Sequence, residues 1–180
     1  MADEAARLGR VVANVLGFTK LERGVLNVHP ETGDLSAVIR ECVARQQPTL
    51  EAAGARVELT LDGEWPPLRF DRDAVAQIVQ NLLDNADKHT RGAADRTIHV
   101  SLAPDSNGVA LAVRDHGPGI PAGVRRRLFR PFERGNHTDA PAGMGLGLVL
   151  VQALARAHGG SVAYADAPDG GAQFTVTFPS

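Results

Sequence analysis

One predicted helix, over residues 71–89, carries the polar pattern that most constrains the fold. Asn81, Asn85 and Lys88 follow one another at spacings of four and three residues, so on a helix they share one face. The neighbouring side is apolar and is expected to pack into a core; it comprises Ile78, Val79, Leu82, Leu83 and Ala86. Magnesium prefers oxygen ligands and usually shares its coordination shell with phosphates. The pattern therefore favours a helix that presents amide oxygens and a cation to a magnesium-bound nucleotide.

The segment DHGPGI, at Asp115–Ile120, follows a predicted strand over residues 109–113. A carboxylate accepts hydrogen bonds, so Asp115 can read the exocyclic amine of adenine, whereas guanine has a carbonyl at that position. Gly117 and Gly119 allow the backbone to turn sharply and to approach a bound base. In isolation the segment is equally well explained as a tight turn with an Asp cap. Its order after the Asn-bearing helix favours the nucleotide.

A second glycine-rich segment, GMGLGL at Gly143–Leu148, precedes a predicted helix over residues 147–158. Backbone amides freed by Gly143, Gly145 and Gly147, together with the helix N-terminus, form an anion site suited to a triphosphate. The glycine spacing does not match the Rossmann fingerprint, and the sequence contains no P-loop. The chain is therefore expected to bind a nucleotide by a different arrangement.

With LFRPFERG at Leu128–Gly135, these segments resemble the ATP-binding domain of bacterial sensor histidine kinases, a family grouped with the gyrase, Hsp90 and MutL ATPases. The resemblance covers about residues 35–180, and residues 4–24 resemble the end of the kinase dimerisation region. It implies an α/β fold of the Bergerat (GHKL) type, a two-layer α/β sandwich with the nucleotide between the helix layer and a lid. ATP and Mg²⁺ are the implied cofactors.

The resemblance also assigns roles to individual residues. Asn85 matches the Asn that coordinates the Mg²⁺ ion, Lys88 matches a lysine that contacts phosphate, and Arg134 could reach the terminal phosphate from the lid. These three form the implied catalytic set, with Asn85 as the metal ligand. The implied cofactor-binding set is Asn81, Asn85, Lys88, Asp115, Gly117, Gly119, Ile120, Gly143, Gly145, Leu146 and Gly147.

Alternating apolar residues and helical periodicity predict a mixed, largely antiparallel sheet of about five strands with three main helices. Pro48 is expected to kink or interrupt the first of these helices, which begins near Asp34. Residues 118–142 are rich in Gly, Pro, Arg and Ala and are expected to form the lid, with a short helix near 124–128.

The predicted domain organisation has three parts. Residues 1–24 form the C-terminal part of a dimerisation and phosphotransfer helix, residues 25–34 a linker, and residues 35–180 the catalytic ATP-binding domain. The first helix carries apolar residues at the 3,4 spacing of a helical bundle, at Leu8, Val11, Val15 and Phe18. The alternative is a helix that packs on its own domain.

Composition excludes several classes of function. The formal net charge of −2 gives no basic excess, so nucleic acid is not an expected partner. Cys42, the only cysteine, excludes an internal disulfide and a multi-thiolate metal site, and is expected to be buried. The sequence has neither the ~20 apolar residues of a membrane span nor a signal peptide. We expect a cytoplasmic fragment without direct membrane contact, compatible with a parent protein anchored in the inner membrane.

The resemblance implies transfer of the γ-phosphate of ATP to a histidine, followed by relay to the receiver domain of a response regulator. Hydrolysing relatives carry Glu where this chain has Asn81, which cannot act as a general base. None of the six histidines lies in the family's phosphoacceptor sequence. The acceptor is therefore expected on a dimerisation domain of the same or a partner kinase, and the chain alone is not expected to autophosphorylate. The main alternative is a stand-alone serine kinase of the anti-sigma-factor type; a mechanical ATPase and a nucleotide-sensing scaffold are others.

Overall fold

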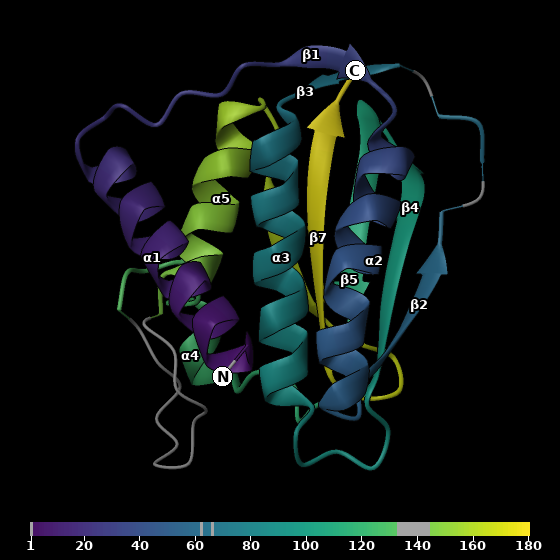
Figure 1. Cartoon of the computed structure of the whole chain (residues 1–180). Helices are drawn as coiled ribbons and strands as arrows, with labels where there is room; N and C mark the ends of the chain where they lie inside the picture. Colours follow the sequence, from purple (N-terminus) through teal and green to yellow (C-terminus); the bar gives the residue numbers. More distant parts are fainter. Residues whose placement is uncertain (1, 62, 66, 133–144) are drawn as a thin grey trace.

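The computed structural model describes residues 2–61, 63–65, 67–132 and 145–180 (Figure 1). Within these residues the helices are α1 (Ala2–Glu22), α2 (Leu35–Ala52), α3 (Arg72–His89), the short α4 (Ala122–Arg125) and α5 (Gly147–Ala157). The strands are β1 (Glu31–Gly33), β2 (Arg56–Thr60), β3 (Leu68–Phe70), β4 (Thr97–Asp105), β5 (Gly108–Arg114), β6 (Val162–Asp166) and β7 (Ala172–Pro179).

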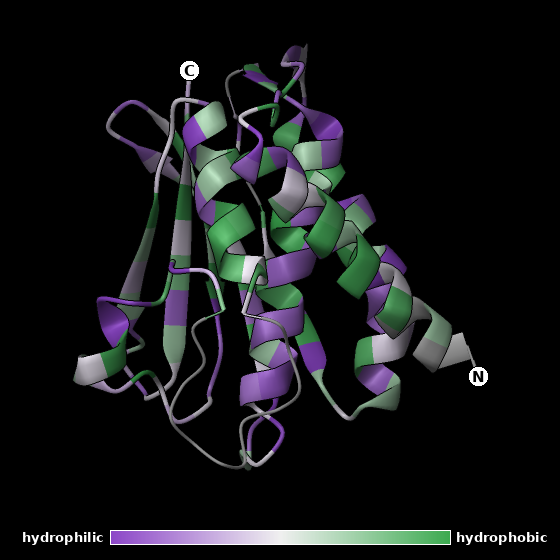
Figure 2. Cartoon of the chain, turned by 90° about the vertical axis from the view of Figure 1, so that its left-hand side faces the viewer, coloured by the Kyte–Doolittle hydropathy of each residue, from purple (hydrophilic) through white to green (hydrophobic). Residues whose placement is uncertain are grey.

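The main sheet contains five strands in the order β2-β4-β5-β7-β6. Strand β2 runs parallel to β4, and every other neighbouring pair is antiparallel. Helices α2, α3 and α5 lie side by side on one face of this sheet (Figure 1), and the view from the side shows helices and sheet as two layers (Figure 2). The predicted two-layer α/β sandwich with a mixed, largely antiparallel sheet is confirmed.

Helix α3 forms where the sequence places a cap before an amphipathic segment. The Asp71 side chain accepts hydrogen bonds from the backbone amides of Asp73 and Ala74, which satisfies donors that an N-terminus otherwise leaves unpaired. The same carboxylate accepts a bond from the His29 amide at 2.8 Å and so ties the segment before β1 to α3. The hydrophobic stripe of α3 is completely buried between α2, α5 and the sheet; it includes Val75, Ile78, Val79, Leu82 and Leu83.

The core lies between the helix layer and the sheet, where side chains from both are almost inaccessible to solvent. Burial of each such large aliphatic side chain stabilises the fold by about 1.5–3 kcal/mol. Cys42 is buried and free, as predicted. The largest fully buried side chains are Phe178, Leu35, Ile39, Leu61, Leu68, Ile78, Leu82, Leu83, Ile98, Leu111, Leu150 and Val43.

The prediction that Pro48 interrupts its helix was wrong. Helix α2 runs through Pro48 to Ala52. Pro48 lies on the exposed side, where water can satisfy the carbonyl that loses its partner, while Val43 and Leu50 anchor the helix to the core on either side.

Two further elements differ from the sequence prediction. The pair β1–β3, a two-stranded antiparallel ribbon, was not predicted. The short lid helix α4 begins at Ala122 and ends at Arg125, so it precedes most of the predicted span 124–128. Of the predicted lid, 118–142, only residues 118–132 are within the described part of the chain.

Helix α1 packs against α5, with Gly17 buried between them: a Cβ on Gly17 would lie 3.1 Å from the Leu150 side chain. Another face of α1 leaves four large apolar side chains exposed, those of Leu8, Val12, Val15 and Leu16. The predicted seam is therefore divided, since Leu8 and Val15 are exposed whereas Val11 and Phe18 are partly buried. Among the described helices, none is both long and apolar enough to cross a bilayer.

Candidate nucleotide site

The C-terminal half of α3 forms the centre of the candidate site. Asn81 is only 7% exposed, and its Nδ2 atom has no hydrogen-bond partner among the described residues. Its Oδ1 lies beside the start of α5, because a Cβ on Gly147 would be 3.2 Å from this oxygen. Asn85, one turn further along α3, is partly exposed and forms no side-chain hydrogen bond within the described part of the chain. No described side chain or backbone group therefore occupies the Asn81 amide nitrogen or the Asn85 amide group.

Asp115 follows β5 directly and is held by the backbone on both sides. Its Oδ1 accepts hydrogen bonds from the Gly117 amide at 2.8 Å and from the Ala172 amide at 3.1 Å. The side chain is 2% exposed, and within the described residues its Oδ2 has no hydrogen-bond partner. These bonds orient the carboxylate and leave one oxygen to accept a bond from a ligand.

The loop after Asp115 lies against the end of α3. A Cβ on Gly117 would be 2.6 Å from the carbonyl oxygen of His89, so only glycine fits there. Gly119 lies beside the backbone of Gly171, and Ile120 packs partly buried against the core. The predicted segment Asp115–Ile120 is thus fixed between α3 and the turn that precedes β7.

The start of α5 supplies the third part of the site. Gly145 has φ +67°, in the left-handed region, and Leu146 is buried at the N-cap position without a side-chain capping bond. The first amides of a helix have no partner within the helix, so the amides that begin α5 at Gly147 can bind an anion. Two predicted site residues, Gly143 and Arg134, lie outside the described residues.

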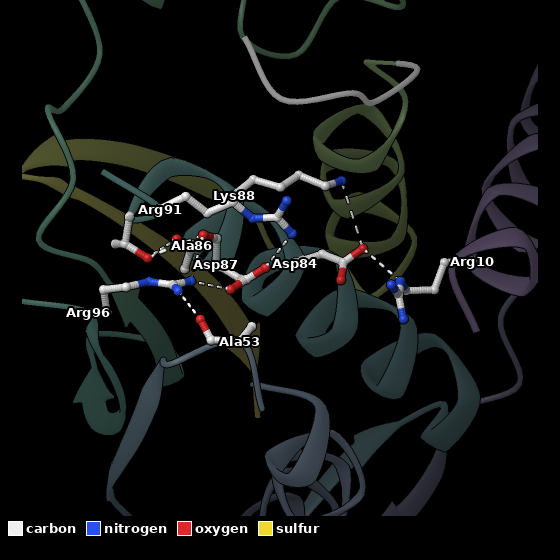
Figure 3. Close-up of polar contacts among 9 residues, drawn as sticks. Arg10, Ala53, Asp84, Ala86, Asp87, Lys88, Arg91 and Arg96 are labelled. Carbon is white, nitrogen blue, oxygen red and sulfur yellow. Dashed lines mark hydrogen bonds and ion pairs between the residues drawn. The ribbon is translucent and has the colours of Figure 1, made fainter. Parts of the chain in front are cut away.

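Lys88 and Asp84 link the site to α1 (Figure 3). The Lys88 Nζ lies 3.9 Å from Asp84 Oδ2, and Arg10 Nε from α1 lies 3.1 Å from the same oxygen. Burial raises the pKa of Asp84, although both cations oppose this shift. Lys88 is one third exposed, so it can leave this weak contact to approach a phosphate.

Helix α1 also contacts the start of the lid. The rings of Phe18 and Phe132 meet edge to face with centroids 5.5 Å apart. Phe129, three residues earlier, packs against the core. The two phenylalanines thus connect the start of the lid to α1 and to the core.

Sequence reasoning missed an ion pair that supports the end of α3. Asp87 Oδ1 lies 2.6 Å from the Arg96 guanidinium, which also donates to the Ala53 carbonyl after α2, and Arg91 binds the other carboxylate oxygen at 3.0 Å (Figure 3). The spacing of Asp87 and Arg91 could have signalled their pair. Arg96 and Ala53 meet only through the fold.

His116, inside DHGPGI, also has a partner that sequence reasoning missed. Its Nε2 lies 3.0 Å from Nε2 of His99 on β4. Within the described part of the chain, no group of three or more metal-ligating side chains converges on one point. A role for His116 in a multi-residue metal centre is therefore not supported.

The three predicted segments thus come together around one end of α3. Gly147 touches Asn81 at one side, Gly117 touches the backbone of His89 at the other, and Asn85 lies between them on the helix. Within the described residues, the Asn81 amide nitrogen is buried without a partner and one oxygen of Asp115 is unbound. Together with the first amides of α5, these groups fit a ligand that has amine, hydroxyl and phosphate groups. Neutral amide oxygens suit Mg²⁺ that is shared with phosphates.

Comparison with known proteins gives the family. Residues 70–180 match the family described as "Histidine kinase-, DNA gyrase B-, and HSP90-like ATPase". The chain is 30% identical over 177 residues to the alginate biosynthesis sensor protein KinB of Pseudomonas aeruginosa, covering 98% of this chain and 29% of KinB. It is 31% identical over 170 residues to the sensor protein KdpD of Escherichia coli K12, covering 94% of this chain and 18% of KdpD. The chain spans less than a third of the length of these relatives.

Solved structures agree over nearly the whole chain. Full-length ShkA in complex with AMPPNP superposes with a TM-score of 0.79 at 26% identity, covering 99% of this chain and 37% of ShkA. The Acinetobacter baumannii histidine kinase AdeS gives a TM-score of 0.76 at 25% identity, covering 99% of this chain and 81% of AdeS. The chain therefore belongs to the family of histidine kinase-, DNA gyrase B- and HSP90-like ATPases, and within it to the ATP-binding catalytic domains of sensor histidine kinases.

Proposed function

We propose that this domain binds Mg-ATP and transfers the γ-phosphate to a histidine on a dimerisation domain of the same or a partner kinase. A response regulator receiver domain would then receive the phosphoryl group. The observation that carries the proposal is the convergence of the Asn face of α3, the Asp115 loop and the N-terminus of α5. We further propose that this part of the protein lies in the cytoplasm, where ATP and receiver domains are available.

Each part of the site has a proposed task. Asp115 Oδ2 accepts a hydrogen bond from the exocyclic amine of adenine, and the first amides of α5 bind the phosphates. Asn85, supported by Asn81, supplies an oxygen ligand to Mg²⁺, which when bound neutralises phosphate charge and aligns the γ-phosphate. Lys88 leaves Asp84 and contacts phosphate, and Arg134 approaches the terminal phosphate from the lid.

Transfer to a protein side chain is favoured over hydrolysis. Activation of water needs a general base near the γ-phosphate. Position 81 holds an amide, and the Asp84 carboxylate remains engaged by Arg10 from α1 when Lys88 contacts phosphate. The proposal therefore gives the domain no carboxylate base on α3 for water attack.

The remaining domain assignments also belong to the proposal. We infer that residues 1–24 end a dimerisation helix, that 25–34 are a linker and that 35–180 form the catalytic domain. The exposed apolar stripe Leu8, Val12, Val15 and Leu16 supports the first assignment. A stand-alone serine kinase of the anti-sigma type is not favoured, because the relatives that match nearly all of this chain are sensor kinases.

Calorimetric titration with ATP, ADP and GTP, with and without Mg²⁺, tests the binding step. We expect saturable, adenine-selective binding that Mg²⁺ strengthens, and loss of Mg-ATP binding in Asn85→Ala. Asn107→Ala is the matched control, since Asn107 lies in the β4–β5 turn at the opposite end of β5 from Asp115. Unchanged ATP affinity in Asn85→Ala would refute the site assignment.

Transfer is tested by mixing the domain and radiolabelled ATP with a kinase fragment that bears the acceptor histidine. We expect acid-labile label on the acceptor, as phosphohistidine. Release of inorganic phosphate without labelling of the acceptor would favour an ATPase.

A further inference from the structure

Ile120, the last residue of the DHGPGI segment, is held at both of its backbone polar groups. Its amide donates to the Tyr164 hydroxyl at 3.1 Å, and its carbonyl oxygen accepts from Arg125 Nε at 2.8 Å. Tyr164 lies on β6 and Arg125 ends α4. Two segments distant in sequence therefore hold one residue at the point where the Asp115 loop passes into the lid.

Asp166 closes this arrangement into a ring. The Tyr164 hydroxyl donates to Asp166 Oδ1 at 2.6 Å, and the Arg125 guanidinium donates to the same oxygen at 2.8 Å. The guanidinium carbon of Arg125 also lies 5.3 Å from the centroid of the Tyr164 ring, a cation–π contact. We call Tyr164, Arg125 and Asp166 the Ile120 clamp.

The protonation states in the clamp suit this geometry at neutral pH. Burial and the hydrogen bond to Asp166 raise the pKa of the Tyr164 hydroxyl, so it remains a donor. The hydrogen bond from Tyr164, with the nearby Arg125 charge, lowers the pKa of Asp166, so its carboxylate remains an acceptor. The clamp therefore keeps its donor and acceptor at neutral pH, and weakens as the pH falls through the lowered pKa of Asp166 or rises through the raised pKa of Tyr164.

We propose that the Ile120 clamp is a set of positioning residues that preorganises the Asp115–Ile120 loop for adenine nucleotide, an inference that rests on the proposed ATP site. The loop is fixed at its start by Asp115, which accepts bonds from Gly117 and Ala172. Within the described residues, the only hydrogen bonds at its far end are those of the clamp to Ile120. A loop free at one end must be ordered on binding, and that entropy cost lowers affinity.

The clamp is suited to local ordering more than to global stability. The side chains of Arg125 and Asp166 are 40% and 56% exposed, and ion pairs so exposed contribute little to the free energy of unfolding. Loss of the clamp should therefore change ligand binding and the exposure of one backbone amide, while the melting temperature changes little. This separation distinguishes a positioning role from a structural one.

The test uses the whole chain with substitutions in the clamp. Tyr164→Phe removes the hydroxyl and keeps the ring packed near Phe174. Arg125→Ala removes the bond to the Ile120 carbonyl, and Arg126→Ala is its matched control on the next, exposed residue. Asp166→Asn keeps an acceptor oxygen, so it should bind ATP nearly as tightly as wild type. Asp166→Ala removes that oxygen and should bind ATP more weakly.

We expect ATP to bind about fivefold to tenfold more weakly to Tyr164→Phe and Arg125→Ala, because each variant loses the equivalent of one net hydrogen bond. Hydrogen exchange at the Ile120 amide should accelerate in Tyr164→Phe. In transfer assays the KM for ATP should rise with kcat unchanged, because the lost interaction acts on binding. Arg126→Ala should match wild type in every measurement.

The outcomes separate the two levels of inference. Absence of ATP binding by the wild-type chain would remove the proposed function and this inference with it. Binding by wild type with equal affinity in Tyr164→Phe and Arg125→Ala would overturn the clamp alone. Faster exchange at Ile120 without weaker ATP binding would also overturn it, because the clamp would then order a loop that the nucleotide does not use.

Discussion

Substitution of Asp115 separates its structural role from its proposed role in adenine recognition. In Asp115→Ala the amides of Gly117 and Ala172 lose their acceptor, and the Ala172 amide is buried. An unpaired buried donor costs about 1–3 kcal/mol, and the partly exposed Gly117 amide costs less. We therefore expect the free energy of unfolding to fall by about 2–4 kcal/mol. For a chain of this size that corresponds to a fall in melting temperature of about 5–15 °C.

Asp115→Asn should preserve the fold and change recognition. The amide oxygen can accept the same two backbone bonds, and the amide nitrogen then replaces the free Oδ2. A donor would face the donor of adenine, so we expect ATP affinity to fall about 10-fold to 150-fold, the value of a hydrogen bond to a charged group. The same nitrogen can donate to the carbonyl of guanine, so the ratio of GTP to ATP affinity should rise.

Thermal unfolding and calorimetry on the two variants test this reasoning together. The expected pattern is a destabilised Asp115→Ala and an Asp115→Asn that unfolds near the wild-type temperature but has lost its preference for ATP. A melting temperature of Asp115→Ala equal to wild type would refute the structural account of the two backbone bonds. Undiminished ATP selectivity in Asp115→Asn would refute the assignment of Oδ2 to adenine.

Three further predictions concern elements that support the site. Hydrogen bonds from backbone amides lower the pKa of Asp71 despite its burial, so Asp71→Ala should cost about 1–2 kcal/mol near pH 7. This contribution is present above the unfolded-state pKa of about 3.9 and is lost as the pH falls through the lower pKa of the folded state. The free energies of unfolding of variant and wild type, measured in urea, should therefore become equal in acid. Gly117→Ala should destabilise the chain by about 1–3 kcal/mol, because the new Cβ would contact the carbonyl oxygen of His89. Gly123→Ala is the control, since its Cβ would meet no atom within 4 Å. Equal melting temperatures of the two variants would contradict the close approach at Gly117. Arg96→Ala leaves the largely buried Asp87 with one exposed partner, Arg91. Chemical denaturation should therefore show a free energy of unfolding about 2–3 kcal/mol lower than wild type. A decrease below about 0.5 kcal/mol would disprove this estimate.

Local signals predicted the parts of the site that one segment can encode. The apolar stripe around Ile78 predicts the helix and hence the face that carries Asn81 and Asn85. The alternation that ends before Asp115 places this carboxylate at the end of β5. These features need only helical or strand periodicity, which is why the sequence contains them.

Features that depend on pairing between distant segments could not be predicted. Ala172 binds Asp115 because β7 pairs with β5 in a register that aligns Arg114 with Gln173. Tyr164 meets Ile120 through the same sheet, and no short-range pattern marks either contact. The continuation of α2 past Pro48 likewise depends on tertiary anchoring of Val43 and Leu50, which outweighs the local preference of proline.

The position of β7 has a consequence for synthesis of the protein. This strand comes after the other described strands in sequence yet lies inside the sheet, between β5 and β6. While residues 172–179 remain in the ribosomal tunnel, β5 has an unpaired edge, and the Asp115 carboxylate lacks the Ala172 amide that helps to orient it. Such an open edge can pair with other chains. The nascent domain should therefore expose this edge until β7 emerges, and Asp115 gains its second backbone bond only after that moment.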